Sequence, residues 1–159
     1  MRFNQEPYLH TPYSISDVLK DDHPMLRGIS ITAIPQNPEH KTIAQKLMAT
    51  VESLGALGIA APQVGVHLRI IAIKDNSANP IKRIMLNPEV IARDGKKRMT
   101  EGCLSLPGKS VEIKRSKRIT VRYQDIEGNE ITEKFSGLAA RIVLHEIDHL
   151  NGKLMTDYA

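Results

Sequence analysis

The segment from residue 137 to 150 restricts the fold of this chain more than any other part of it. Its apolar residues recur at helical spacing and form one broad face, at Leu138, Ile142, Val143 and Leu150. Ser136 can cap the start of a helix, and Asn151-Gly152 is a typical stop. We therefore expect a central helix from about Gly137 to Leu150, with its apolar face covered by other elements.

The preceding segments predict a fold that mixes one further helix with antiparallel strands. Apolar positions from Ile43 to Leu54 recur at helical spacing and stop near Gly55, which predicts an amphipathic helix. Short runs rich in β-branched residues predict strands at 69–73, 83–86, 118–123 and 130–135, the last two joined by a hairpin turn at 125–129. The expected fold class is α+β, with antiparallel or mixed β-sheets packed around the C-terminal helix.

Length and composition predict one compact domain over residues 1–159. The chain has 41% hydrophobic residues but no apolar stretch that could span a bilayer, and Met1–His10 lacks the features of a secretory signal. We expect a soluble, cytoplasmic protein in which the proline-interrupted segment 1–27 wraps the surface. The single cysteine, Cys103, cannot form an intramolecular disulfide, which suits a reducing compartment and leaves its thiol free.

The charge balance is mildly basic, at +4, and does not by itself require a nucleic-acid ligand. Basic residues cluster at 96–98 and 114–118, but the chain has only 4% aromatic residues and no Trp for base stacking. A solvated strand or turn is therefore the favoured interpretation of both clusters, and sequence-specific nucleic-acid binding is not expected. A contact between the 114–118 cluster and ribosomal RNA is the alternative.

The expected helix carries two histidines one turn apart, His145 and His149, on the same face. Two imidazoles at this spacing can coordinate one metal ion, and Glu146 between them is placed to act as a general acid or base. The alternative is a helix surface that happens to carry two histidines. The glutamate in the one useful position favours the metal site.

A catalytic metal centre of this kind usually takes three protein ligands and leaves one position open. Cys103 offers the third ligand from the Gly- and Pro-bounded segment 101–108. A free cysteine taken alone is more often simply buried, but the short turns around it and the histidine pair favour a thiolate ligand.

A third segment, 56–65, is rich in small residues that allow close approach of another backbone or a ligand. Gln63 in this segment provides an amide that could donate a hydrogen bond to a developing oxyanion. A plain connection between a helix and a strand is the alternative interpretation.

Together the three segments resemble peptide deformylases. That family carries, in this order, a Gly/Ala-rich stretch ending in Gln, the motif Glu-Gly-Cys-Leu-Ser and the motif His-Glu-x-x-His with Asp before the second His. Here they stand at 56–63, 101–105 and 145–149, and the resemblance runs from about His23 to the last helix.

The resemblance implies hydrolysis of the N-terminal formyl group of formyl-methionyl nascent peptides, with release of formate. It implies that Cys103, His145 and His149 bind one divalent metal ion and that Glu146 handles protons. Gln63 and the backbone N–H of Leu104 would stabilise the oxyanion. The peptide would lie in the cleft as an added β-strand. Candidates for lining that cleft are Leu57, Gly58, Glu101, Gly102, Ile142 and His145.

The resemblance also implies Fe²⁺ as the native metal, with Zn²⁺, Ni²⁺ or Co²⁺ as alternatives, because thiolate ligation suits several metals. We expect a monomer that contacts the ribosome transiently and no membrane. Asp148 is expected either to support a ligand, held by a cation such as Arg115, or to be a plain surface carboxylate.

The chain departs from the family pattern in two places. Ala56 stands where the first motif usually begins with Gly, which adds a methyl group near the cleft. The chain ends at Ala159, so the C-terminal extension of many relatives is short or absent. Neither departure touches an expected ligand, so they bear on peptide preference and efficiency.

Two other classes of protein fit the sequence less well. A zinc endopeptidase shares the two histidines and the glutamate, but only ten residues follow His149 and none is His or Glu. A structural metal site, or a degenerate enzyme that only binds, is the non-enzymatic alternative. A structural site would need four protein ligands, and the remaining histidines stand outside any ligand-like spacing, at His10, His23, His40 and His67.

Overall fold

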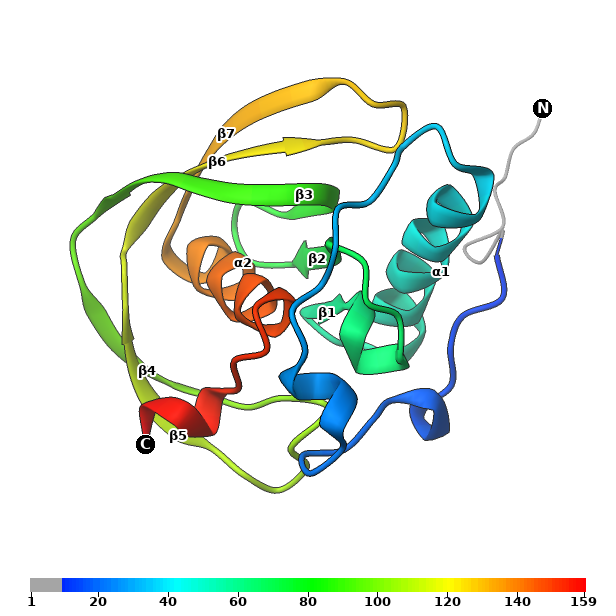
Figure 1. Ribbon diagram of the computed structural model, residues 1–159. Helices are drawn as coiled ribbons and strands as arrows, with labels where there is room; N and C mark the ends of the chain where they lie inside the picture. The colour runs from blue at the N-terminus through cyan, green and yellow to red at the C-terminus, as the bar shows by residue number, and fades with distance from the viewer. Residues whose placement is uncertain (1–9) are drawn as a thin grey trace.

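The computed structural model describes residues 10–159 (Figure 1), so the expectations for residues 1–9 lie outside the described residues. The α-helices are α1 (Pro38–Leu54) and α2 (Gly137–Leu150). The strands are β1 (Gly58–Ala60), β2 (Ile70–Asp75), β3 (Ile81–Asp94), β4 (Lys97–Glu101), β5 (Val111–Arg115), β6 (Arg118–Gln124) and β7 (Glu130–Ser136). Short 3-10 helices are η1 (Ile15–Asp17), η2 (Pro24–Arg27), η3 (Ala61–Val64) and η4 (Met155–Tyr158).

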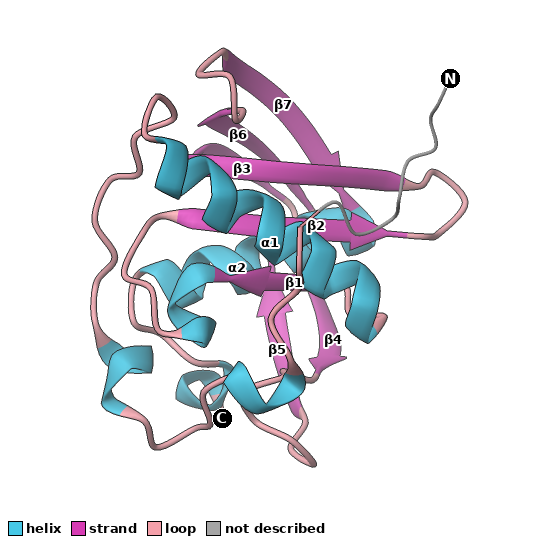
Figure 2. Cartoon of the chain, turned by 90° about the vertical axis from the view of Figure 1, so that its right-hand side faces the viewer, coloured by secondary structure: helices cyan, strands magenta, loops and turns pink. Residues whose placement is uncertain are grey.

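The strands form two antiparallel sheets, as expected for the α+β class. One sheet has five strands in the order β1-β2-β3-β6-β7, and β4 pairs with β5 in a second sheet. The long β3 and the neighbouring β6 curve around α2, and β4 and β5 continue that curve below it (Figures 1 and 2). The C-terminal helix therefore lies in the centre of the molecule, as predicted.

Strand β2 is buried on both faces because a helix covers each side of it. Ile71 and Ile73 pack into the cluster that contains the apolar face of α2. Ile70 and Ala72, which point the other way, pack against α1. The alternation of side chains along one strand thus joins the two cores and fixes the position of α2 against the sheet.

The expected elements are largely present, with differences at their ends. Helix α2 has the expected bounds, but the side chain of Ser136 makes no capping hydrogen bond. Helix α1 begins before Ile43, at Pro38, because the amide oxygen of Asn37 caps a polar first turn that carries no apolar signal. The hairpin at 125–129 closes with a hydrogen bond from the N–H of Asp125 to the carbonyl of Asn129.

Strands β1, β4 and β5 were not predicted. Both basic clusters fall in or beside β4 and β5, and most of their side chains are exposed, as expected for a solvated strand or turn, but Arg115 and Ser116 are buried. The segment 10–27 runs along the outside but is anchored by two buried side chains, Val18 and Leu26. Within residues 10–159, no helix combines the length and the apolar character that crossing a membrane requires.

Candidate metal centre

Three potential ligands converge between α2 and the loop after β4. One donor atom from each of Cys103, His145 and His149 lies within 4.8 Å of the others. The Cys103 Sγ and the His149 Nε2 are 3.4 Å apart. Metal–sulfur and metal–nitrogen bonds of about 2.3 and 2.1 Å at a tetrahedral angle would place such atoms roughly 3.6 Å apart. The spacing therefore fits joint ligation of one ion.

The orientation of the histidines also fits a metal. His145 Nδ1 lies 2.8 Å from Glu101 Oε1, which leaves its Nε2 for the ion. His149 is almost fully buried, and burial lowers its pKa to about 3, so the imidazole is neutral as ligation requires. One thiol and two imidazoles form a donor set suited to a divalent transition metal.

Glu101 is the centre of a buried ion-pair cluster beside the ligands. Arg115 donates to both of its carboxylate oxygens, and Arg141 donates to Oε2 at 2.6 Å. Burial opposes ionisation of Glu101, but hydrogen bonds from His145 and Arg115 outweigh it and lower its pKa to about 2. Both carboxylate oxygens of Glu101 thus have buried partners, and Oε1 holds the imidazole of His145 in place.

Glu146 is buried beside the ligands, and its Oε1 has no hydrogen-bond partner among residues 10–159. Burial raises the pKa of this carboxyl to about 7. Gly58 leaves room for it, since a Cβ at Gly58 would lie only 2.8 Å from Glu146 Oε2. The carboxyl is therefore placed and tuned for proton transfer.

Gln63 is held in η3 with its amide directed at the ligand loop. Its Oε1 accepts from the N–H of Ala60 at 2.9 Å, and its Nε2 donates to Ser105 Oγ at 3.1 Å. The same Nε2 lies 3.7 Å from Cys103 Sγ. The amide nitrogen is thus fixed next to the proposed ion, where an oxyanion donor is needed.

A mainly apolar cleft of about 530 Å³ opens onto this centre. All the residues expected to line the cleft lie on its wall: Leu57, Gly58, Glu101, Gly102, Ile142 and His145. Gln63, Cys103, Leu104 and Glu146 face the same space. The reactive groups therefore share one cavity.

Residues 15–159 match the polypeptide deformylase family. The chain belongs to this family. Its activity is that of a deformylase, a metallo-hydrolase that removes the N-formyl group from nascent peptides, and the Cys103, His145 and His149 site is typical of deformylases.

Similar deformylases cover nearly the whole chain. The chain is 39% identical to the peptide deformylase of Dictyoglomus thermophilum over 91% of its own length and 93% of that protein. The crystal structure of the Thermotoga maritima deformylase superposes with a TM-score of 0.83 at 35% identity, covering 94% of this chain and 98% of the other. The Met-ala-ser-bound deformylase of Acinetobacter baumannii superposes with a TM-score of 0.84 at 29% identity, covering 89% and 96%.

Several residues of this deformylase site were not predicted from the sequence. Arg141 donates to Glu101 and to two backbone carbonyls, and Ser105 accepts from Gln63. Arg141 could have been found from the sequence: it is the one charged residue in the otherwise apolar stretch 138–144, one turn before His145, so it needs a buried partner. Ile15, Met99 and Leu138 also line the cleft.

Proposed function

We propose that this chain hydrolyses formyl-methionyl peptides at one divalent metal ion held by Cys103, His145 and His149. The single observation that carries the proposal is the meeting of three ligand atoms with an unpartnered buried carboxylate at the wall of an apolar cleft. A divalent ion at such a site supplies Lewis acidity and lowers the pKa of water. Residues of the chain supply proton transfer, stabilisation of the oxyanion and binding of the peptide.

Glu146 moves the proton in this reaction. It accepts the proton of the attacking water while the water oxygen bonds to the formyl carbon. It then gives the proton to the leaving nitrogen as the C–N bond breaks, which yields formate and a free amino terminus. Its unpartnered Oε1 is available for both transfers.

Gln63 and Leu104 stabilise the negative charge that develops on the formyl oxygen. The Gln63 Nε2 is held in place by the contact between its Oε1 and the Ala60 N–H. Leu104 directly follows the ligand Cys103 and lines the same cleft, so its backbone N–H is the second donor in this proposal. Donors that are already oriented cost little reorganisation during the reaction.

The peptide binds as an extended strand. Strand β1 is one of the two outer strands of the five-stranded sheet, so its outer edge at Gly58, which lines the cleft, can pair with a peptide. The methionine side chain then enters the apolar part of the cleft, beside Leu57, Gly58 and Ile142. Gly102 also lines the cleft, where the absence of a side chain allows close approach of the peptide.

The native metal in this proposal is Fe²⁺, with Zn²⁺, Ni²⁺ and Co²⁺ able to occupy the same donors. If iron is native, activity of the iron form fades in air as the metal and the Cys103 thiolate oxidise. Full activity of the iron form after prolonged aeration would contradict this expectation. The protein in this proposal is a single catalytic domain that acts in the cytoplasm as a monomer. Chromatographic size measurement tests the monomer directly.

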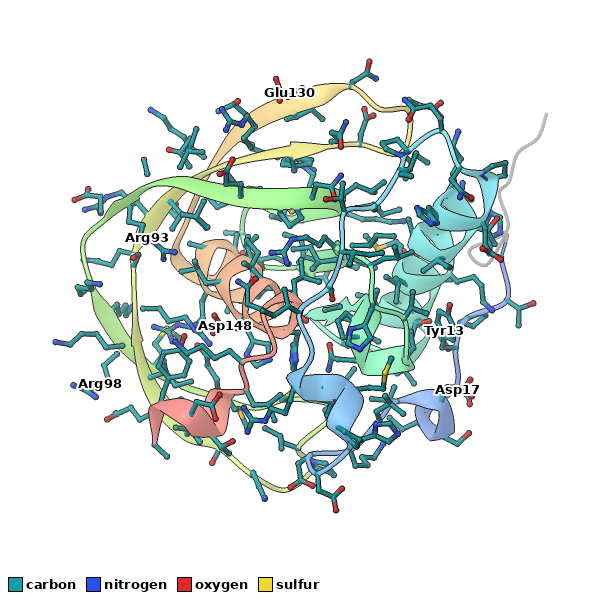
Figure 3. The ribbon with its side chains drawn as sticks, viewed as in Figure 1. Tyr13, Asp17, Arg93, Arg98, Glu130 and Asp148 are labelled. Atoms are coloured by element: carbon teal, nitrogen blue, oxygen red, sulfur yellow. The ribbon has the colours of Figure 1, made fainter. Side chains whose placement is uncertain are left out.

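The proposed contact with the ribosome uses exposed cations in and near the turns that join β3 to β4 and β5 to β6. Arg93 and Arg98 point outward at this side (Figure 3), and Lys114 and Lys117 are exposed beside them. Arg115 is not part of this surface, because it is buried against Glu101. Cosedimentation with ribosomes should weaken steeply with salt if phosphates are contacted.

Formate release from formyl-Met-Ala-Ser by anaerobically prepared protein, with metal content read on the same sample, tests the reaction. We expect Glu146→Ala to keep its metal and lose most turnover, and Cys103→Ala to lose both. Stoichiometric metal without formate release in the wild-type protein would contradict the proposed reaction, or point to a peptide preference altered around Ala56.

A further inference from the structure

We propose that Tyr158, in the C-terminal turn η4, is a positioning residue for the metal ligand His145. It acts through Asp148, Arg115 and Glu101, and nothing in the mechanism above uses it. The inference rests on the proposed function only in that it requires a metal at the Cys103, His145 and His149 site.

The first link joins η4 to the end of α2. The Tyr158 hydroxyl donates to Asp148 Oδ2 at 2.7 Å, and Arg115 Nη1 donates to the same oxygen at 2.9 Å. The Arg115 Nη1 is also 3.4 Å from the Tyr158 oxygen, and the guanidinium lies over the tyrosine ring at 4.9 Å. Asp148 belongs to α2 and is labelled in Figure 3 on the side of that helix toward η4. Tyr158 therefore fixes both the carboxylate and the guanidinium.

The second link joins Arg115 to the metal ligand. Arg115 Nη2 donates to Glu101 Oε1 at 2.9 Å, and the same oxygen lies 2.8 Å from His145 Nδ1. The side chains of Arg115 and Glu101 are each only 5% exposed, so water cannot replace a lost contact. A shift of the guanidinium must therefore move the oxygen that orients His145.

The turn that carries Tyr158 is held by an apolar cluster on its inner side and an ion pair on its outer side. Leu154 and Met155 are buried in a small cluster with Leu26, Leu106 and Ile113, and Cys103 packs against this same cluster. Arg27 pairs with Asp157 at 2.7 Å on the outside of the turn. The C-terminal turn thus touches the supports of two of the three proposed ligands.

The hydroxyl is the part of Tyr158 that carries the proposal. Tyr158→Phe keeps the ring over Arg115 but removes a donor to Asp148, so the Asp148 and Arg115 pair can rotate. A matched control exists in the large sheet, where the Tyr123 hydroxyl donates to Glu133 at 2.6 Å and Arg83 pairs with that carboxylate at 2.8 Å. Tyr123→Phe removes the same kind of contact without touching a ligand.

The test uses the cobalt-substituted protein, whose visible absorption reports ligand geometry. We expect Tyr158→Phe to change the ligand-field bands and to speed transfer of cobalt to a chelator by about 10-fold, the low end for groups that support metal ligands. Tyr123→Phe should leave both unchanged. Asp148→Asn should give the same spectral change, and the double variant should add little, since both substitutions break one path.

A wild-type spectrum and release rate in both Tyr158→Phe and Asp148→Asn would overturn the proposal, even if turnover fell. Equal changes in Tyr158→Phe and Tyr123→Phe would also overturn it, because the effect would then be general loosening. Failure of the proposed function is separate: the wild-type protein would bind cobalt without releasing formate, and the spectral comparison would still decide the role of Tyr158.

Discussion

A tyrosine, a carboxylate and an arginine meet at two places in this molecule. In the sheet cluster, Tyr123 and Arg83 both contact Glu133 across β3, β6 and β7. In the helix cluster, Tyr158 and Arg115 both contact Asp148 at the end of α2. The local chemistry is the same, so any difference between them must come from their surroundings.

The two clusters differ in burial and in what lies beyond the arginine. The side chain of Arg83 is 37% exposed, whereas that of Arg115 is 5% exposed. Arg83 bonds beyond its cluster only to the adjacent Lys82 carbonyl, among the described residues, but Arg115 continues to Glu101 and so to His145. Of the two clusters, only the helix cluster is therefore connected, through the second buried carboxylate of Glu101, to a proposed metal ligand.

Removing each arginine should give the largest difference between the clusters. Arg115→Met leaves Asp148 without its cation and takes one of the two guanidinium partners from Glu101. Such a change in a buried ion pair costs about 3–5 kcal/mol. Arg83→Met breaks a pair that solvent screens, which costs about 0–1 kcal/mol. Urea unfolding of the metal-free variants measures both values, and equal losses would contradict the comparison.

Replacing the carboxylates of Glu101 and Glu133 in turn shows which of the two clusters supports metal binding. Glu101→Gln weakens the hold on His145 Nδ1, and we expect a loss of metal affinity of about 10- to 100-fold. Glu133→Gln should leave metal affinity unchanged, because the sheet cluster touches no ligand. Competition with a chelator of known affinity measures the difference. An affinity loss in Glu133→Gln would show that the clusters are coupled through the sheet.

The sequence predicted the helix that carries the site better than the contacts that support it. Both ends of helix α2 were predicted correctly, because its apolar period and its Asn151-Gly152 stop are local features of the sequence. The bonds from Glu101 to Arg115, Arg141 and His145 join residues 14, 40 and 44 positions apart. No local pattern encodes such pairs, so Glu101 was expected in the cleft wall but not as the partner of a ligand.

The strands β1, β4 and β5 were missed for different physical reasons. Strand β1 has three residues, too few to show a period. Strands β4 and β5 each bury few side chains, and apart from the buried Arg115 their basic residues point outward, so the sequence indicated only a solvated strand or turn there. The three motifs that carry chemistry were found because metal ligands must be of specific residue types, whereas supporting residues need only fit.

The smallest expected effect is the loss of stability at acid pH that depends on the sheet cluster. Burial raises the pKa of Glu133, but hydrogen bonds from Arg83 and Tyr123 outweigh it and leave the pKa below its usual value. A carboxyl whose pKa is lower in the folded state stabilises the protein above its unfolded pKa, and this stability is lost as the pH falls through the folded value.

The metal-free wild-type protein should therefore lose more stability than Glu133→Gln between neutral pH and about pH 3. Glu130→Gln is the matched control, since Glu130 lies on the same strand and points outward (Figure 3). It should follow the wild-type curve. The stability that Tyr123→Phe loses on acidification should lie between the losses of Glu133→Gln and the wild type, because this variant lacks one of the two donors that lower the pKa of Glu133. If Tyr158→Phe gave the same intermediate curve, acid stability would not distinguish the two clusters, and the distinction would depend on metal binding alone.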